Sequence, residues 1–396
     1  MEGLQSAGLV PGDLVAVTRA SGPGWIDQVA EVWDAGAALF PVDRRLSDRE
    51  MTNVVQAARP TLVLGPRGCM RRDDGLPADP GVVLVVQTSG TGGVPKLAQF
   101  DRPAVEAAVA ASALALGATP VDPWLSCLPP SHVGGLLVIL RALLLGAPVT
   151  VYRRFEVSAF VAERDAVFTS LVPTMLTRLL DAEVDLRRYR AILVGGAHLP
   201  EHLRAKAERA GANVIETYGL TESFGGIVYD GRPLSGVKVR TGDAGEIELS
   251  GPTLMLGYRS SASEATRQAF TRDGWLRSGD AGEIDGAGLL QVIGRLDDLI
   301  DSGGEKVWPE EVEAALSDHP RVRDVAVAGR LDREWGHRVV AFVVPADPED
   351  PPTLEELRSF SSHTLPRYKG PRELVLVKDL PRTTLGKLRR VALAGE

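Results

Sequence analysis

The amino-acid sequence predicts an α/β protein. It comprises a large N-terminal domain of mostly parallel sheets with helices and a small β region, followed by a small, mobile α+β domain. Three observations lead to this prediction: short apolar segments alternate with helical patterns, Gly-rich turns separate short strands after Arg232, and the last part of the chain carries its own helices and strands. The alternation favours parallel sheets covered on both faces. We expect the domains to span residues 1–294 and 295–396.

The strands expected in the N-terminal domain are short and rich in β-branched residues. They are Leu14–Thr18, Thr61–Leu64, Val82–Val86, Pro148–Tyr152, Ala166–Ser170, Ala191–Val194 and Asn213–Thr217. Helices are expected over Gly24–Gly36, Pro103–Leu116 and Glu201–Ala210. The most apolar stretch, residues 134–151, contains Arg141 and Pro148 and is too short to cross a bilayer. It is interpreted as a buried helix followed by a strand.

After Arg232 the expected strands are short and are separated by Gly-rich turns. A small antiparallel β region is expected over Gly245–Leu249, Trp275–Arg277 and Leu290–Ile293. A second break follows at Gly294–Gly304. Beyond it we expect a helix at Pro309–Ser317, strands at Val325–Ala328 and Val339–Val344, a loop at Pro345–Pro352 and a further helix. These elements are enough for a compact C-terminal domain.

Composition excludes several classes of protein. The chain has 396 residues, 44% of them hydrophobic, and a net charge of −8 without a cluster of Lys and Arg, so a nucleic-acid-binding stripe is not expected. The two cysteines, Cys69 and Cys127, have neither disulfide-framework nor zinc spacing, which favours a reducing cytoplasm. The segment Met1–Asp13 lacks the features of a signal peptide. The sequence does not decide the oligomeric state, and a homodimer is one of the open alternatives.

The strongest functional signal is the segment 87–96, which directly follows an apolar strand. Its three glycines permit a tight turn whose N–H groups can converge on an anion. The hydroxyls of Thr88, Ser89 and Thr91 and the charge of Lys96 suit a polyphosphate. Pro95 before the lysine excludes both a Walker A loop and a dinucleotide fingerprint. On composition alone, an ordinary flexible loop is the alternative.

This segment resembles the phosphate loop of the adenylate-forming superfamily, which contains acyl-CoA synthetases, luciferases and peptide-synthetase adenylation domains. Four further segments resemble that superfamily in the same order, so that the resemblance covers residues 81–390. One departure is Gly92, which stands where the family usually has a second threonine. The loss of that hydroxyl bears on how tightly pyrophosphate is held.

The resemblance implies roles for individual residues. The phosphates are assigned to Thr88, Ser89, Gly90, Thr91, Gly92, Gly93 and Lys96. Residues Gly195, Gly196, Ala197, Tyr218 and Gly219 are expected around the nucleotide and the acyl group. Thr221 is expected to contact the α-phosphate and Glu222 to bind Mg²⁺. Asp280 and Arg295 are expected on the ribose, Asp297 at a hinge, and Lys387 as the catalytic lysine.

Each assignment has a simpler alternative. Taken singly, Asp280 is a turn residue and Lys387 a solvated lysine; their order relative to the phosphate loop favours the functional roles. A lone histidine such as His132 is usually a core residue, but the family places an aromatic or histidine side chain here beside the reacting carboxylate. Residues 198–202 fit the H-x-x-E-H zinc pattern. Pro200, however, is expected to begin the helix and leave His198 outside it.

The function implied is that of a ligase that uses ATP, Mg²⁺ and coenzyme A. A carboxylic acid would first become an acyl-adenylate and then a thioester. The compact segment 222–233 and the short N-terminal domain resemble the o-succinylbenzoate–CoA ligases of actinobacterial menaquinone synthesis. Such a dicarboxylate needs a partner for its second carboxylate, and His132, Ser223 and Arg141 are the candidates. Another acyl- or aryl-acid CoA ligase, an adenylating amide-forming enzyme and a non-catalytic adenylate-binding relative are the alternatives.

Overall fold

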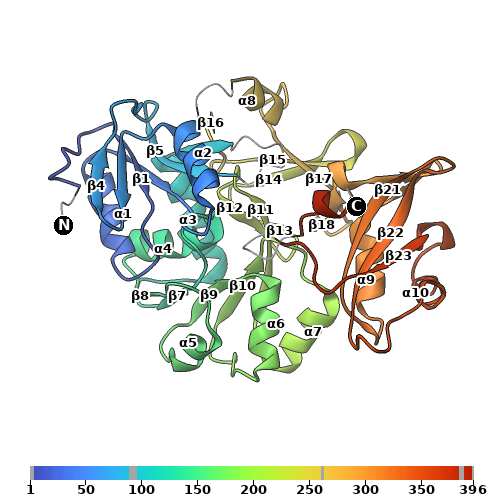
Figure 1. Ribbon diagram of the computed structural model, residues 1–396. Helices are drawn as coiled ribbons and strands as arrows, with labels where there is room; N and C mark the ends of the chain where they lie inside the picture. Colours follow the sequence, from blue (N-terminus) through green and yellow to red (C-terminus); the bar gives the residue numbers. More distant parts are fainter. Residues whose placement is uncertain (1–3, 89–95, 260–262, 383–387, 395–396) are drawn as a thin grey trace. The chain divides into compact units, whose positions relative to one another are not determined.

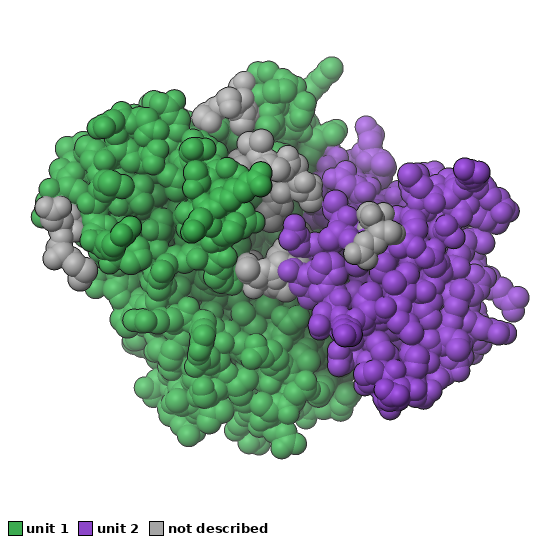
Figure 2. Space-filling model, in the orientation of Figure 1, with its two compact units in different colours: residues 1–239, 249–277 green, residues 240–248, 278–396 purple. Residues whose placement is uncertain are grey.

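The structure is a computed structural model that describes residues 4–88, 96–259, 263–382 and 388–394. The chain divides into two compact units, coloured separately in Figure 2. Unit 1 contains residues 1–239 and 249–277, and unit 2 contains residues 240–248 and 278–396. These units are defined by compactness. The predicted boundary between residues 294 and 295 is that of a mobile domain, and it stays a prediction.

Unit 1 contains a first seven-stranded sheet, called sheet A, with the order β16-β6-β5-β2-β1-β3-β4 (Figure 1). Its strands are β1 (Leu14–Val17), β2 (Ala38–Pro41), β3 (Leu62–Gly65), β4 (Gly68–Arg71), β5 (Val82–Gln87), β6 (Leu97–Asp101) and β16 (Gly257–Tyr258). Pairing is parallel among β5, β2, β1 and β3 and antiparallel at both ends of the sheet. Every residue of β1 and β2 is buried, as expected for central strands covered on both faces.

A second seven-stranded sheet, sheet B, has the order β13-β12-β11-β10-β9-β7-β8. Its strands are β7 (Trp124–Ser126), β8 (Val149–Val151), β9 (Phe168–Leu171), β10 (Ala191–Gly195), β11 (Val214–Leu220), β12 (Gly225–Tyr229) and β13 (Arg232–Pro233). The five strands from β8 to β11 are parallel, and β12 and β13 are antiparallel. The predicted α/β class with much parallel sheet is confirmed.

Helices cover both sheets of unit 1. They are α1 (Trp25–Asp34), α2 (Asp48–Ala58), α3 (Arg102–Leu116), α4 (Val133–Leu145), α5 (Val157–Ala162), α6 (Pro173–Asp181), α7 (Glu201–Arg209) and α8 (Ser263–Ala269). Helix α3 packs on β5 and β6, α4 packs on β7, β9 and β12, and the two helices contact each other. Helices α6 and α7 lie together beside β10 and β11 (Figure 1). None of the described helices is long and apolar enough to cross a membrane.

Local signals explain where several of these helices begin and end. A capping box between Ser47 and Glu50 begins α2, and the Asp101 side chain accepts a hydrogen bond from the backbone of α3. Gly117 and Gly146 end α3 and α4 in the left-handed conformation that glycine adopts at low cost. The apolar stretch at 134–151 is indeed a buried helix followed by a strand.

Unit 2 is built mainly on two smaller sheets. One has the order β14 (Lys238–Thr241), β15 (Glu246–Ser250), β17 (Leu276–Ile284) and β18 (Leu290–Arg295). The other has the order β20 (Glu305–Val307), β19 (Ile300–Ser302), β22 (Gly336–Pro345) and β21 (Val322–Asp332), with β23 (Glu373–Leu376) beside β22. The helical segments are η1 (Asp243–Gly245), η2 (Leu296–Asp298), α9 (Pro309–Ser317), α10 (Leu354–Ser361), η3 (Arg367–Lys369) and α11 (Val391–Ala394).

Two strands of unit 2 are longer than the sequence predicted. The expected strand Trp275–Arg277 is the start of β17, whose later part contains glycines and a register shift after Ala281. The expected strand Val325–Ala328 is the middle of β21, which pairs with β22 along its whole length. The ends of both strands contain charged, exposed residues that interrupt the apolar alternation. These ends are extended because they pair with a neighbouring strand, and burial does not contribute.

Arg390 gathers three carboxylates in unit 2. Its Nη1 lies 3.0 Å from Asp298 Oδ2 and 3.0 Å from Glu310 Oε1, and its Nη2 lies 2.7 Å from Glu313 Oε2. Burial raises the pKa of Glu310 to about 7, although the charge of Arg390 opposes this. The guanidinium therefore ties η2, which contains the predicted hinge residue Asp297, to α9.

The first prediction concerns Glu310→Gln. The folded-state pKa of about 7 exceeds the ordinary 4.5, so the folded chain binds more protons between these values and its free energy of unfolding falls as pH rises through that window. Glutamine resembles the protonated acid and should remove that fall, which we expect to be about 2 kcal/mol. Denaturant unfolding of both proteins between pH 5 and pH 8 measures it. Parallel pH profiles would contradict the assignment.

Candidate active site

The predicted site residues of unit 1 gather where parallel strands end. Strands β2 and β5 of sheet A run in one direction, and so do β7, β10 and β11 of sheet B. Thr88 directly follows β5, while Thr221 and Glu222 directly follow β11. His132 stands between β7 and α4 as the N-cap of α4. Ligands of α/β proteins bind at such carboxyl edges.

Hydrogen bonds join the carboxyl edges of the two sheets. His132 Nε2 lies 3.3 Å from Asp43 Oδ2, and Asp43 follows β2. The Tyr258 hydroxyl on β16 donates to Glu222 Oε1 over 2.7 Å. Lys96 Nζ lies 5.3 Å from the centre of the Tyr258 ring. The structure thus brings together Lys96 and Glu222, which the sequence assigned to the phosphates and to Mg²⁺ separately.

The histidine is held by a pair of opposite charges. Arg45 Nη2 lies 2.6 Å from Asp43 Oδ2 and 3.4 Å from His132 Nε2. Burial opposes ionisation of Asp43, but hydrogen bonds from His132 and Arg45 outweigh it and hold the pKa of this carboxyl well below its usual range. Nε2 can donate to the carboxylate or accept from the guanidinium. The imidazole therefore keeps its orientation in either tautomer.

Glycines allow the strands at this edge to approach closely. A Cβ on Gly195 would lie 2.3 Å from Thr217 Oγ1, and one on Gly219 would lie 1.8 Å from the carbonyl oxygen of Gly225. Gly196 has a φ of +81°, which an L side chain rarely adopts. Ala197 follows it, and Tyr218 precedes Gly219 on β11. Close packing therefore requires glycine at positions 195 and 219, and the backbone conformation favours it at position 196.

The segment 222–233 contains the turn between β11 and β12, strand β12, and the return to β13. Its turn contains Phe224 at a φ of +57°, and the backbone N–H of Phe224 donates to the carbonyl of Thr221. The Ser223 hydroxyl accepts from Leu220 N at 2.8 Å and lies 3.0 Å from the carbonyl oxygen of Gly225. Ser223 is fully buried, so its hydroxyl serves the turn and is not available to a substrate.

The residues predicted for the ribose lie in unit 2. Asp280 on β17 and Arg295 on β18 are cross-strand partners, and Arg295 Nη1 lies 2.9 Å from Asp280 Oδ1. Burial lowers the pKa of the Arg295 guanidinium, but the charge of Asp280 outweighs it and leaves that pKa raised. Asp297 lies in η2 with its side chain 86% exposed. An exposed side chain at a turn is compatible with a hinge, a role that stays a prediction.

Some predictions fall outside the described residues. These are the roles of Ser89, Gly90, Thr91, Gly92, Gly93 and Lys387. Helix α7 begins at Glu201 after an N-cap at Pro200. His198 therefore lies outside the helix, as the sequence predicted, and does not share a helical face with His202.

The sequence reasoning missed Tyr258, Asp43 and Arg45. Burial, and then the adjacent Glu222 carboxylate, raise the pKa of the Tyr258 phenol, so the hydroxyl stays a donor. Asp43 and Arg45 follow a buried strand within a short polar segment. That position was the available signal for these two, since polar residues after a central parallel strand lie at the carboxyl edge. Tyr258 carries no comparable local signal.

Comparison with known proteins identifies the family. The family of AMP-binding enzymes matches residues 72–259, and the AMP-binding enzyme C-terminal domain matches residues 311–387. A probable 2-succinylbenzoate–CoA ligase of Mycobacterium tuberculosis is 40% identical over 328 residues, covering 80% of this chain and 84% of the relative. The 2-succinylbenzoate–CoA ligase of Bacillus licheniformis is 35% identical over 332 residues, covering 77% and 68%. The chain belongs to the family of AMP-binding enzymes.

Solved structures agree with this. The o-succinylbenzoate CoA synthetase of Bacillus subtilis in complex with its acyl-adenylate intermediate has a TM-score of 0.88 and 27% identity, covering 99% of this chain and 90% of that one. ATP-bound MatB from Rhodopseudomonas palustris has a TM-score of 0.88 and 25% identity over the same shares. The predicted membership of the adenylate-forming enzymes is confirmed.

The second prediction concerns Asp280→Asn. The amide offers one acceptor where the carboxylate offers two, and Arg295 loses its ionic partner. We expect the KM for ATP to rise about tenfold, the effect of one hydrogen bond to a charged group, with little change in kcat. ATP–pyrophosphate exchange at saturating acid measures both. Glu283→Gln, an exposed change on the same strand, is the control, and an unchanged KM for ATP would remove Asp280 from the ribose site.

Proposed function

We propose that this chain is an AMP-forming acid–CoA ligase that converts o-succinylbenzoate into o-succinylbenzoyl-CoA in menaquinone biosynthesis. The observation that carries the proposal is that Lys96 and Glu222 both contact Tyr258 at the carboxyl edges of two parallel sheets. It occurs in a chain 40% identical to a probable 2-succinylbenzoate–CoA ligase. We infer a cytoplasmic location, because ATP and CoA are its proposed substrates, and a homodimer stays a prediction.

The first half-reaction joins the acid to AMP. A carboxylate oxygen attacks the α-phosphorus of ATP, the new oxygen–phosphorus bond forms, and pyrophosphate leaves. Negative charge gathers on phosphate oxygens, so catalysis consists of positioning and electrostatic stabilisation. Thr88 and Lys96 hold the β- and γ-phosphates, Thr221 contacts the α-phosphate, and Lys387 reaches the α-phosphate and the attacking oxygen. His132 borders the reacting carboxylate.

The residues present suit a magnesium ion. Mg²⁺ is usually held by one or two carboxylates together with substrate phosphates. Glu222 supplies one carboxylate, of which Oε1 accepts from Tyr258 and Oε2 would hold the ion. When bound, the metal supplies positive charge to the phosphate oxygens.

The second half-reaction moves the acyl group to CoA. The thiolate sulfur attacks the acyl carbon, the carbon–sulfur bond forms and AMP leaves. For this step the C-terminal part of the chain rotates about Asp297, which withdraws Lys387. The rotation brings the β19–β20 hairpin to the acyl group. In that hairpin Lys306 Nζ lies 2.6 Å from Asp301 Oδ2, and Gly303 and Gly304 form the turn.

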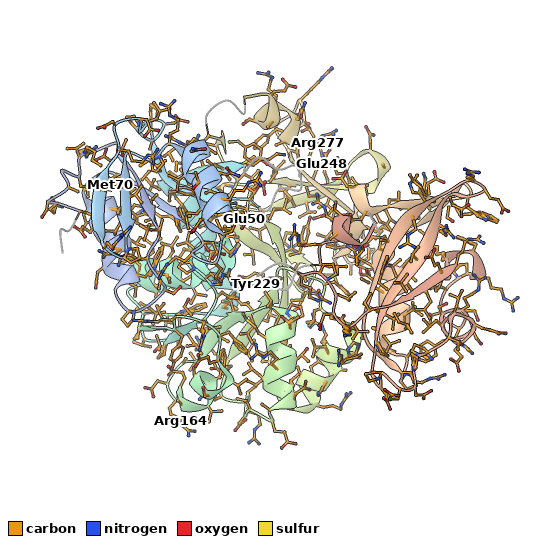
Figure 3. All side chains as sticks on the ribbon, in the orientation of Figure 1. Glu50, Met70, Arg164, Tyr229, Glu248 and Arg277 are labelled. Carbon is orange, nitrogen blue, oxygen red and sulfur yellow. The ribbon has the colours of Figure 1, made fainter. Side chains whose placement is uncertain are left out.

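The buried Arg141 supports a dicarboxylic substrate. Its side chain lies on α4 with 2% exposure, above the Trp124 ring at 5.2 Å. Its Nη2 donates to the Tyr229 hydroxyl over 3.2 Å, at a position labelled in Figure 3. Its Nε and Nη1 have no hydrogen-bond partner among the described residues. Burial lowers the pKa of Arg141, and Tyr229 only partly opposes this.

A buried cation without an anion is costly, and a carboxylate ligand would remove that cost. Arg141 lies nine residues after His132, or about 13 Å along α4. Its guanidinium lies over Trp124, the first residue of β7, and bonds Tyr229, the last residue of β12. Three residues are candidate partners for the second carboxylate. Of these, Ser223 is hydrogen-bonded within the β11–β12 turn and His132 is hydrogen-bonded to Asp43. Arg141 is nearly as buried as Ser223, but two of its donors have no partner among the described residues, and we propose it on that ground.

The third prediction concerns Lys387→Ala. Loss of the cation that reaches the α-phosphate should lower the rate of adenylate formation by a factor of about 100 or more, the effect of removing one preorganised charge. Thioester formation from pre-made o-succinylbenzoyl-adenylate should continue. Both half-reactions can be followed separately by quenched flow. Lys378→Ala, an exposed lysine on the same unit, is the matched control, and equal losses in both half-reactions would overturn the role.

The fourth prediction concerns the substrate. Arg141→Met should raise the KM for o-succinylbenzoate about 100-fold, since a charged hydrogen-bonded pair is lost, and leave the KM for ATP unchanged. The melting temperature should not fall, because an unpaired buried charge is removed. Arg141→Lys should be intermediate. Arg164→Met, on the exposed surface far from Tyr229 (Figure 3), is the control.

A panel of acids tests the same point in the unmodified enzyme. o-Succinylbenzoate should be preferred over benzoate, octanoate and anthranilate-type acids in kcat/KM for thioester formation. A tenfold preference for a monocarboxylate, worth about 1.4 kcal/mol, would instead favour another acyl- or aryl-acid CoA ligase. Transfer to an amine but not to CoA would favour the amide-forming alternative.

A further inference from the structure

Tyr258 is fixed beside the start of β6 by backbone pairing. Strand β16 is antiparallel to β6, with Tyr258 opposite Ala98 and Gly257 opposite Gln99. Arg259 N also donates to the carbonyl of Leu97 over 2.8 Å. Because β6 begins immediately after Lys96, this register places the backbone of Tyr258 within two residues of that lysine.

The segment that carries Tyr258 is anchored from several sides. The buried Arg259 side chain donates to the carbonyl oxygens of Ala58, Leu76 and Pro77 at 2.7, 2.7 and 2.9 Å. The backbone N–H of Tyr258 donates to Thr266 Oγ1 over 2.9 Å. Tyr258 itself is 9% exposed. Its ring therefore has little freedom to move.

The ring touches two groups of opposite charge. Its hydroxyl donates to Glu222 Oε1 over 2.7 Å, and the Lys96 ammonium lies over the ring at 5.3 Å. The Glu222 main chain is held as well, because Met255 N donates to its carbonyl over 2.9 Å. A cation over a tyrosine face and a carboxylate at its hydroxyl are both favourable contacts.

We propose that Tyr258 is a positioning residue that orients the metal-binding carboxylate and keeps it apart from Lys96. Without the ring, the ammonium and the carboxylate would be free to form an ion pair and neutralise each other. With Oε1 bonded to the hydroxyl and the ammonium held over the ring, Oε2 of Glu222 would hold the ion and Lys96 would stay available to the phosphates. This inference rests on the proposed function, which assigns Glu222 to Mg²⁺ and Lys96 to the phosphates.

The fifth prediction separates the two contacts of the ring. Tyr258→Phe removes the hydroxyl and keeps the ring, while Tyr258→Leu removes both. Without added acid, where no turnover occurs, Mn²⁺ binding to the enzyme–ATP complex is measured by electron paramagnetic resonance, and ATP binding in EDTA by calorimetry. Tyr258→Phe should weaken Mn²⁺ binding about tenfold and leave metal-free ATP binding unchanged. Tyr258→Leu should also weaken metal-free ATP binding about threefold.

Controls decide between the possible failures. Tyr152→Phe removes a hydroxyl that donates to the carbonyl of Ala159 elsewhere in unit 1, and it should change neither affinity. Glu222→Gln should weaken Mn²⁺ binding, and Tyr258→Phe should add little to it, because the hydroxyl acts through that carboxylate. Unchanged Mn²⁺ binding in Tyr258→Phe, or fully additive losses, would overturn the inference alone. Unchanged binding in Glu222→Gln would overturn the metal assignment of the proposed function.

Discussion

The candidate site depends on the parallel direction of the central strands in sheets A and B. Parallel strands bring their carboxyl ends to one edge, and the loops that leave these ends carry Thr88, His132 and Glu222. Polar groups at such an edge are partly buried and need partners. The two sheets supply partners to each other: Asp43 of sheet A bonds His132 of sheet B, and Tyr258 of sheet A bonds Glu222 of sheet B. The hydrogen bonds that satisfy the buried polar groups are thus the same ones that set the geometry of the site.

The buried arginines of this chain illustrate how partners distinguish structure from function. Arg259 donates to three carbonyl oxygens and joins separate loops. Arg390 lies against three carboxylates and ties η2 to α9. Both guanidinium groups are explained by the fold. Arg141 is more buried than either, yet among the described residues its one hydrogen-bond acceptor is the Tyr229 hydroxyl. A charge left without an opposite charge in the folded protein points to a ligand that supplies one.

Motifs could be predicted from the sequence, but the contacts between them could not. Lys96, Glu222 and the glycines stand in local patterns whose spacing carries the resemblance, and the alternation of strands and helices predicts parallel sheets. Tyr258 and Glu222 are 36 residues apart, and Asp43 and His132 are 89 residues apart. These contacts depend on the order of the strands in the sheets, and local sequence periodicity does not predict that order. Strands β6 and β16 were not predicted either. Strand β16 has only two residues and is extended because it pairs with β6, which its own sequence does not indicate.

The anchors on either side of Asp297 limit how a hinge at this position can work. Arg295, two residues before it, is bonded to Asp280 on β17. Asp298, directly after it, is bonded to Arg390 near the end of the chain. A rotation confined to Leu296 and Asp297 leaves both ion pairs intact, so the ribose-side pair stays with β17 and β18 while Arg390 moves with the segment that follows Lys387. The Asp297 side chain is 86% exposed and has few contacts to lose. A pivot between two fixed charges concentrates the change in φ and ψ on very few residues, as a hinge requires.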